Sequence, residues 1–181
     1  MPPKAPSLRQ LKAGDKSAWD ELVDLHYEPL THLVCHILGE WCEDVPDLVQ
    51  EVLVNAYGSI SAFREECSLR SWLYRIALNC CRDYRRSAWK RRVSLPGDPP
   101  EPADGHPDHA PSVVERAHLD AALALLPEAE RLCLQLRFAH ELTGREIAQM
   151  LGQRESAVWN RIHAGLRHLG RILQDEEAKV I

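Results

Sequence analysis

The sequence predicts an all-α protein of two small helical domains joined by a flexible, proline-rich linker. Apolar residues recur at i, i+3 and i+4 on both sides of residues 93–112, whereas alternating β patterns are absent. Residues 93–112 hold six of the twelve prolines and no Phe, Trp or Tyr, so we expect an extended segment there. The predicted divisions are therefore a first domain over 1–92, the linker over 93–112 and a second domain over 113–181.

Four helices are predicted in the first domain from the spacing of their apolar residues. They are Ser17 to Tyr27, Pro29 to Leu38, Val45 to Tyr57 and Leu69 to about Arg86. Pro29 is placed at the start of the second helix, because a first-turn residue does not need the N–H that proline lacks. In the second domain we expect helices over Val113 to Leu126 and Glu128 to Phe138, with Pro127 separating them.

The segment from Thr143 to Leu173 has the residue spacing of a helix-turn-helix. Thr143 can cap the first helix while Glu146, three residues on, reaches back to the N–H of the cap, which is a capping box. Ala148 is small enough for the second helix to cross closely, and Gly152 lies where the chain must turn with a positive φ. The apolar stripe then continues on the second helix at Val158, Ile162, Leu166 and Leu169.

Two positions of the turn fit this motif less well. Gln153 occupies a site that is usually apolar, and Arg154 is a poor N-cap. The exposed start of the second helix nevertheless carries side chains suited to base edges, and two arginines placed to meet phosphate. The first group is Glu155, Ser156, Trp159, Asn160 and His163, and the second is Arg161 and Arg167. For this motif alone, the alternative to DNA binding is an ordinary helical hairpin with a solvated basic face.

Charge is distributed unevenly, although the whole chain carries only −5. Between Asp15 and Glu51 ten acidic residues face one lysine, a net charge of −9. Between Arg64 and Arg92 nine basic residues face three acidic ones, a net charge of +6. We therefore expect one acidic and one basic surface in the first domain, which suits two different partners.

The six cysteines show no CxxC pair and no spacing typical of a zinc site. The chain has no run of about eighteen apolar residues and no signal-peptide core, so we expect a cytoplasmic location and reduced thiols. His32, Cys35 and His36, with Cys42 nearby, share a helical face and could in principle ligate a metal. The alternative, which we favour, places Cys35 in the core and the histidines at the surface or its boundary.

Three segments follow one another in a characteristic order and spacing. They read DLVQEVLVNAYGSI at 47–60, FREECSLRSWLYRIALNCCRDYRRSAWKRR at 63–92 and LALLPEAERLCLQLRFAHELTGREIAQMLG at 123–152. Together they resemble a bacterial alternative sigma factor of the extracytoplasmic-function group, which has only sigma regions 2 and 4. The resemblance covers nearly all of the chain apart from the linker and the two tails. Two-component and quorum regulators share the final helices, but their N-terminal domain would be α/β.

The resemblance implies a promoter-specificity subunit of RNA polymerase, with no catalytic site, no cofactor and no bound metal of its own. Asp47, Gln50 and Glu51 share the polar side of a helix that, in this family, docks on a coiled coil of the polymerase β′ subunit. From the residues alone, a solvated acidic face would be the preferred interpretation. Other implied partners are promoter DNA and an anti-sigma factor, often membrane-anchored, in a stress response. Such a partner would sequester the chain at the inner membrane without inserting it.

The resemblance also assigns recognition and melting of the minus-ten element to the first domain. Unstacking a base costs a few kcal/mol, which a pocket and backbone contacts can offset. The expected residues lie in the loop 64–70 and on the helix after it: Arg64, Ser68, Arg70, Arg75, Asn79, Arg82 and Arg86. Glu65 and Glu66 depart from the family pattern, which more often has Gly and a single acid there. The second domain would read the minus-thirty-five element with its helix-turn-helix.

Two other classes of protein are weighed against this interpretation. A DNA-binding regulator would read a metal or redox signal through His32, Cys35, His36 and Cys42 and would bind a palindrome as a dimer. A cytosolic thiol enzyme would use Cys80 or Cys81, but the nearest histidines in sequence are His36 and His106, so a base is missing.

Overall fold

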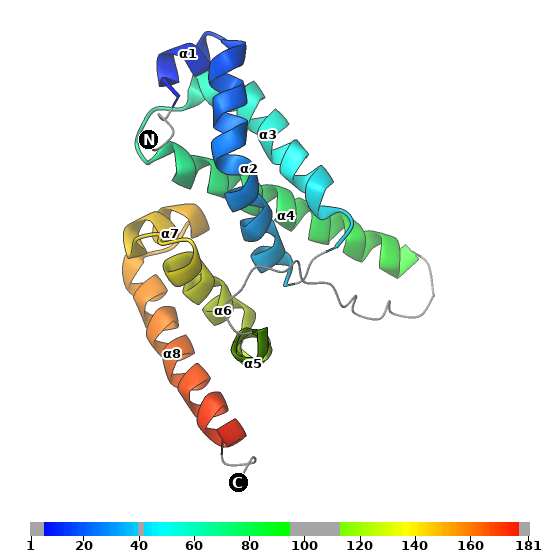
Figure 1. Ribbon diagram of the computed structural model, residues 1–181, viewed down its shortest axis with the longest axis vertical. Helices are drawn as coiled ribbons and strands as arrows, with labels where there is room; N and C mark the ends of the chain where they lie inside the picture. Colours follow the sequence, from blue (N-terminus) through cyan, green and yellow to red (C-terminus); the bar gives the residue numbers. More distant parts are fainter. Residues whose placement is uncertain (1–5, 40–41, 95–112, 178–181) are drawn as a thin grey trace. The chain divides into compact units, whose positions relative to one another are not determined.

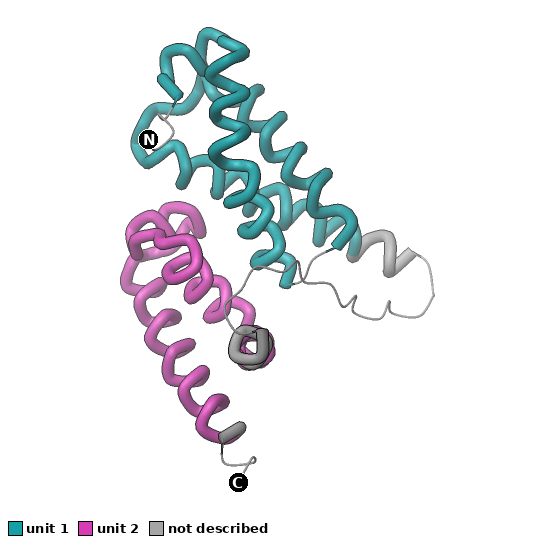
Figure 2. Tube along the Cα trace, viewed as in Figure 1, with its two compact units in different colours: residues 1–104 teal, residues 105–181 magenta. Residues whose placement is uncertain are grey.

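The computed structural model describes residues 6–39, 42–94 and 113–177, and within these ranges every regular element is helical. The chain divides into two compact units, residues 1–104 and 105–181, shown in different colours in Figure 2. The predicted all-α fold is therefore confirmed. Residues 95–112, which make up most of the predicted linker, lie outside the described residues.

The first unit is built from three long helices that pack against one another (Figure 1). They are α2 (Lys16–Leu38), α3 (Val45–Ser59) and α4 (Leu69–Ser94). A short helix α1 (Leu8–Lys12) precedes them, and a 3-10 turn η1 (Ile60–Ala62) follows α3. Their shared core includes fully buried leucines, valines and alanines, which the hydrophobic effect removes from water. Among them are Leu22, Leu33, Val49, Val52, Leu73 and Ala77.

The prediction of separate helices over 17–27 and 29–38 was wrong, because α2 runs through Pro29 without a break. Proline in a helix interior costs about 3 kcal/mol or more. Here the buried face continues on both sides of it, with Leu22 and His26 before it and Leu30 and Leu33 after it. Burying each such side chain gains about 1.5–3 kcal/mol, so the continuous helix is favoured despite the proline.

The first unit also differs from expectation at helix α1 and at the end of helix α4. Helix α1 was not predicted, since its five residues are too short for a periodic pattern; Leu11 is buried and its carbonyl accepts the indole N–H of Trp19 at 3.0 Å. Helix α4 ends at Ser94, two residues inside the predicted linker. Pro96 is the first residue after it that disfavours a helix.

The second unit contains α5 (Val113–Ala124), α6 (Glu128–Leu134), a π-helical turn η2 (Gln135–Ala139), α7 (Gly144–Leu151) and α8 (Glu155–Glu177). Helix α8 packs against α5, α6 and α7. Where it meets α6, a Cβ added to Gly165 would come within 2.9 Å of Leu134 Cδ1, so the glycine permits a close approach. The helix predicted over 128–138 is α-helical only as far as Leu134, because η2 begins at Gln135.

The helix-turn-helix is confirmed in its local detail. Thr143 Oγ1 accepts the backbone N–H of Glu146 at 3.2 Å, and Glu146 Oε2 accepts the backbone N–H of Thr143 at 2.9 Å. Gly152 ends α7 with φ 66 and ψ 37, and Ala148 is buried. Leu166, however, is 43% exposed, because the 3.6-residue period brings Gly165 to the buried side instead.

Replacing Thr143 by Ala should lower the free energy of unfolding of the second unit by about 1 kcal/mol, since it removes a capping side chain from an N-terminus. Amide hydrogen exchange of residues 144–151 in the full chain would measure the loss. Thr31→Ala is a matched control: its hydroxyl donates to Tyr27 O at 2.9 Å inside α2 and caps no helix. Equal protection of 144–151 in the wild type and Thr143→Ala would contradict the capping role.

Candidate nucleic-acid interface

The start of α8 presents the side chains that the sequence predicts for base contact. Glu155, Ser156, Asn160 and His163 are exposed, and Trp159 lies at the edge of exposure. Val158 and Ile162 face the opposite way and are buried. The arrangement follows from the helical period, because apolar residues at 158 and 162 fix the rotation of α8 against its neighbours. Whether these side chains contact DNA stays a prediction.

The two arginines of this helix differ in their surroundings. Arg167 is exposed, as a phosphate contact requires. Arg161 is half-buried; its guanidinium donates to Gln153 Oε1 and also hydrogen-bonds the Cys133 sulfur. This contact gives the unusual Gln153 a role in the turn, because its side chain accepts a hydrogen bond from a residue of α8. A phosphate contact by Arg161 stays a prediction and would require the guanidinium to share or leave these partners.

Trp159 is seated on the first residue of α7. A Cβ added to Gly144 would lie 2.7 Å from Trp159 Nε1 and 2.8 Å from its Cε2, so the indole occupies the space of that side chain. The indole N–H donates to Glu155 Oε1 at 3.4 Å, and the ring stacks on His163 with centroids 6.0 Å apart. Sequence reasoning missed Gly144, because only the tertiary contact shows why a glycine is needed there.

In the first unit, α3 separates a buried face from a polar one. Leu48, Val49 and Val52 are buried, whereas Asp47, Gln50 and Glu51 are exposed. Within the described residues these three side chains make no hydrogen bond or ion pair, so they are available to a partner. The common face predicted from the sequence is therefore present, while its partner stays a prediction.

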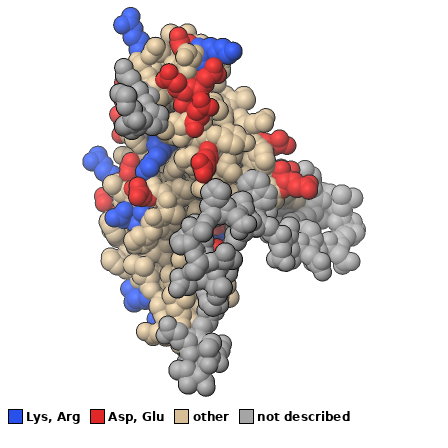
Figure 3. Space-filling view, in the orientation of Figure 1, with Lys and Arg blue, Asp and Glu red and all other residues tan. Residues whose placement is uncertain are grey.

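Acidic side chains also gather on α2. Those it exposes are Asp20, Glu21, Asp24 and Glu28. Figure 3 shows carboxylates concentrated on the face of the first unit where α2 lies in Figure 1. Six of the ten acidic residues between positions 15 and 51 therefore lie on α2 and α3: Asp20, Glu21, Asp24, Glu28, Asp47 and Glu51.

Helix α4 carries a stripe of polar residues along its exposed side. Trp72, Leu73 and Ala77 are buried, and Ile76 is half-buried. The exposed stripe follows the helical period over three turns and consists of Arg75, Asn79, Arg82 and Arg86. Three guanidinium groups on one face make a strip that suits a phosphate backbone.

Two residues in the second half of α4 contact the end of α2 and the residue that precedes α3. Arg85 Nη2 donates to the carbonyls of Ile37 and Leu38 at 2.6 and 3.2 Å, which satisfies free acceptors at the end of α2. Tyr84 OH donates to Asp44 Oδ2 at 2.5 Å. This hydrogen bond to the carboxylate raises the pKa of Tyr84 to about 12. Both contacts join residues 40 or more positions apart, and neither was predicted.

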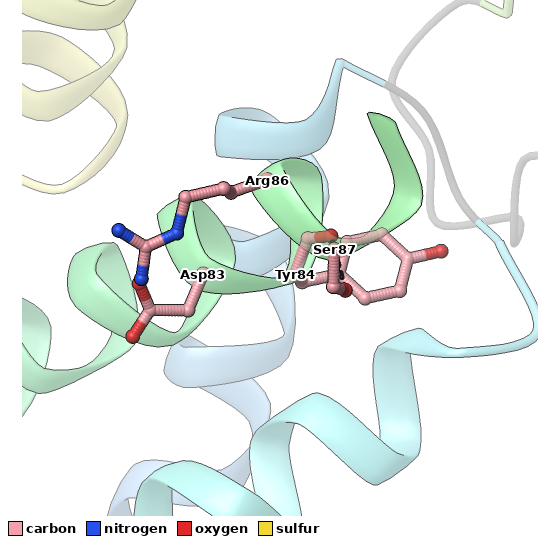
Figure 4. Close-up of polar contacts among 4 residues, drawn as sticks. All are labelled: Asp83, Tyr84, Arg86 and Ser87. Carbon is pink, nitrogen blue, oxygen red and sulfur yellow. Dashed lines mark hydrogen bonds and ion pairs between the residues drawn. The ribbon is translucent and has the colours of Figure 1, made fainter. Parts of the chain in front are cut away.

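Arg86 lies on another side of the same helix. Its Nη2 is 2.8 Å from Asp83 Oδ1, and both side chains are largely exposed. In Figure 4 the Arg86 and Asp83 side chains point toward one another, and the Tyr84 ring points to the opposite side of α4. Because exposed ion pairs contribute little to stability, Arg86 can exchange this partner for a phosphate at low cost.

The loop before α4 has an unusual backbone. Glu65 adopts φ 58, a left-handed conformation that favours glycine. Its ends are fixed: Lys12 Nζ donates to Phe63 O at 2.7 Å, and Ser68 Oγ accepts the N–H of Ser71 at 3.1 Å. Glu65 therefore holds a backbone conformation that glycine adopts more easily, in a loop whose two ends are fixed by hydrogen bonds.

Two arginines flank this loop in different environments. Arg64 is exposed, whereas Arg70 is half-buried with its guanidinium carbon 5.8 Å from the centre of the Tyr74 ring. Burial lowers the pKa of His26, and the Arg70 charge lowers it further. The structure therefore brings Arg70 to α2, apart from the exposed stripe of α4; its role in DNA binding stays a prediction.

The histidines and cysteines near the end of α2 differ in their exposure. His32 is exposed, Cys35 and Cys42 are half-buried, and the described part of the chain contains no group of three His, Cys, Asp or Glu residues that could hold a metal ion. Burial and the neighbouring Cys42 raise the pKa of Cys35 to about 11. Burial and Cys80 raise the pKa of Cys81 to about 12. These thiols are thus protonated at neutral pH.

No helix within residues 6–39, 42–94 and 113–177 combines the length and apolar character needed to cross a membrane.

Two family models match the chain, one in each unit. Residues 22–91 match sigma-70 region 2, and residues 116–169 match sigma-70 region 4. The chain is 29% identical over 161 residues to the ECF RNA polymerase sigma factor SigM of Mycobacterium tuberculosis, covering 89% of this chain and 80% of SigM.

Solved structures show the same similarity. The structure of CnrH in complex with the cytosolic domain of CnrY matches with a TM-score of 0.68 and 26% identity, covering 93% of this chain and 95% of that one. The sigma factor RpoE of Bartonella quintana, in complex with the anti-sigma factor NepR, matches with a TM-score of 0.75 at 20% identity, covering 86% and 96%. The latter likeness concerns the fold.

Cys35 and Cys81 should react slowly with iodoacetamide at pH 7.5, because only the thiolate attacks and a pKa of about 11 or 12 leaves little of it. We expect alkylation at least about 100-fold slower than for an exposed thiol of ordinary pKa, with the rate rising about tenfold per pH unit. Mass spectrometry of the intact chain and its peptides would follow each cysteine, with the unfolded chain as control. Rapid labelling of either thiol in the folded chain would contradict its burial.

Proposed function

The chain belongs to the sigma-70 family, in its extracytoplasmic-function group, and we propose that it binds core RNA polymerase and directs it to a particular set of promoters. It is a transcription initiation factor and not an enzyme, since bond formation belongs to the polymerase. The observation that carries the proposal is the pairing of a region 2 unit that has a polar α3 face and a basic α4 stripe with a region 4 unit that has an exposed helix-turn-helix.

Region 2 is assigned to residues 1–92 and region 4 to residues 113–181. On region 2, Asp47, Gln50 and Glu51 bind the β′ coiled coil of the polymerase. Their support is their common exposure on a helix whose other side is buried, together with the absence of competing partners within the described residues. A rigid helix face of this kind binds without reordering, which lowers the entropic cost of docking.

The basic stripe of α4 and the loop before it bind the minus-ten element. Arg75, Arg82 and Arg86 meet phosphate, and Asn79 lies between them where it can reach a base. Arg64, Ser68 and Arg70 border the loop in which the unstacked base is held. Of these, Ser68 also caps the N-terminus of α4 by accepting the N–H of Ser71, so the loop is joined directly to the helix that carries the stripe.

The recognition helix α8 reads the minus-thirty-five element. Asn160 has the amide that pairs with adenine, and Glu155 has a carboxylate that accepts from the amino group of cytosine. Ser156, Trp159 and His163 complete the face, and Arg161 and Arg167 meet the flanking phosphates.

An anti-sigma factor controls access to these surfaces. It covers the α3 face, the α4 stripe or both, so that neither polymerase nor DNA can bind, in response to a stress. Family membership supports this partner, and the similar CnrH was solved in complex with the cytosolic domain of CnrY. The chain acts in the cytoplasm with the polymerase, and a membrane-anchored inhibitor would hold it at the inner membrane.

Replacing Asp47, Gln50 and Glu51 together by Ala should weaken binding to core polymerase by at least tenfold, because the three groups form one contact surface. Affinity would be measured with labelled full-length chain and purified core enzyme, and circular dichroism should show unchanged helicity. The double variant Asp20→Ala with Asp24→Ala is a matched control, because it also removes two negative charges but takes them from α2. If both variants lose affinity equally, the effect is one of total charge, and the α3 contact is wrong.

Asn160→Ala should change which upstream sequences are transcribed, since a base-edge contact contributes roughly 1–3 kcal/mol of discrimination. Arg167→Ala should instead weaken binding to all sequences and reduce the salt dependence. Transcription by the reconstituted holoenzyme from a library randomised in the upstream element, at two salt concentrations, separates the two effects. Identical preference of the wild type and Asn160→Ala would remove that residue from base recognition.

A further inference from the structure

Glycine at position 144 requires an explanation. It is the first residue of α7, and its φ is not in the left-handed region, so its backbone does not need glycine. Alanine is the better helix former by up to about 1 kcal/mol in a helix interior. What excludes alanine is space, because its Cβ would come within 2.7–3.1 Å of three atoms of the Trp159 indole. The absence of a side chain at position 144 therefore makes room for the indole of Trp159.

The indole that Gly144 receives is only partly exposed. Trp159 is 36% exposed, although it lies on the side of α8 that faces solvent. Its ring packs on Gly144 and stacks on the imidazole of His163, with an angle of 30° between the planes of the two rings. A ring confined in this way has little freedom to adapt to a base pair.

Trp159 also contacts the two exposed side chains one turn before and one turn after it. Glu155, Trp159 and His163 lie at i, i+4 and i+8, which places them in one row along the helix. The indole N–H donates to the Glu155 carboxylate, and the indole face stacks on His163. Glu155 and His163 would otherwise be mobile surface side chains, whose ordering on binding costs about 0.5–1.5 kcal/mol each.

We propose that Trp159 is a positioning residue of the recognition helix: seated on Gly144, it holds the Glu155 carboxylate and the His163 imidazole in fixed places, and so sets how sharply those two side chains discriminate between bases. This inference rests on the proposed function of α8. It differs from the assignment of a direct base contact to Trp159. The indole N–H already donates to Glu155, and much of the ring surface contacts Gly144 and His163.

Trp159→Phe separates the two contacts. A phenyl ring can still lie over Gly144 and beside His163, but it has no N–H to donate to Glu155. Discrimination at the base pair that Glu155→Ala affects should therefore fall, while discrimination at the position that His163→Ala affects should persist. A base-edge contact discriminates by roughly 5- to 150-fold; we expect Trp159→Phe to lose part of this, about threefold to tenfold.

Gly144→Ala tests the seat itself. The added Cβ must displace the indole, so discrimination at both positions should fall together. In a Trp159→Ala background the same substitution should not change base preference, because no ring remains to be displaced. Gly170→Ala is the matched control, since it adds a Cβ to α8 at a site with no heavy atom within 4 Å.

The experiment is transcription by holoenzyme, reconstituted from core polymerase and the full chain, from a promoter library randomised in the upstream element. Base preference at each position is the readout, because a merely structural role would lower transcription from all sequences alike and leave preferences unchanged. Thermal unfolding of each variant identifies loss of folding, and Trp159→Phe keeps the test available if Gly144→Ala is unstable.

Three results would overturn the inference. Unchanged preferences in Trp159→Phe and Gly144→Ala, where Glu155→Ala does change them, would show that Glu155 reads DNA without support. A change at a base pair that neither Glu155→Ala nor His163→Ala affects would show that Trp159 contacts a base directly. Absence of any upstream selection by the wild type would instead refute the proposed role of α8, and the positioning role with it.

Discussion

The first unit depends on the packing of α4 against α2 and α3. One side of α4 is buried through Leu73 and Ala77, and this burial fixes which residues can face outward. The exposed stripe from Arg75 to Arg86 is therefore a consequence of the core and not an independent feature. Arg85 completes the arrangement by donating to the last carbonyls of α2. One guanidinium of this arginine-rich helix thus stabilises the fold, while those of the exposed stripe face solvent.

The second unit achieves the same coupling through glycine. Gly165 lets α8 approach Leu134 of α6, and Gly144 accepts the indole of Trp159. Packing one face of α8 fixes the rotation of the helix about its axis, and this rotation determines the direction of every exposed side chain. These close contacts fix the rotation of α8, and with it the directions of its exposed side chains, at the cost of two residues with low helical propensity.

Local features could be predicted from the sequence, and contacts between distant segments could not. The capping box of Thr143 and the positive φ of Gly152 depend on neighbours within a few residues, and both were predicted correctly. The continuity of α2 through Pro29 depends on burial against α3 and α4, which overrides local propensity. The place of Arg85 and the reason for Gly144 depend on residues 47 or 48 and 15 positions away, for which the sequence has no periodic signal.

The charges of the chain illustrate why local geometry matters more than composition. A net charge of −5 would repel DNA if the chain were a uniform sphere. Interactions between exposed charges are largely screened beyond about 8 Å at physiological salt, so a phosphate senses the stripe on α4 and not the carboxylates of distant turns. The acidic faces of α2 and α3 disfavour DNA at those surfaces, because carboxylates repel phosphate. In the proposed function, these opposite charges on different faces of the first unit orient the chain between its two partners, polymerase and DNA.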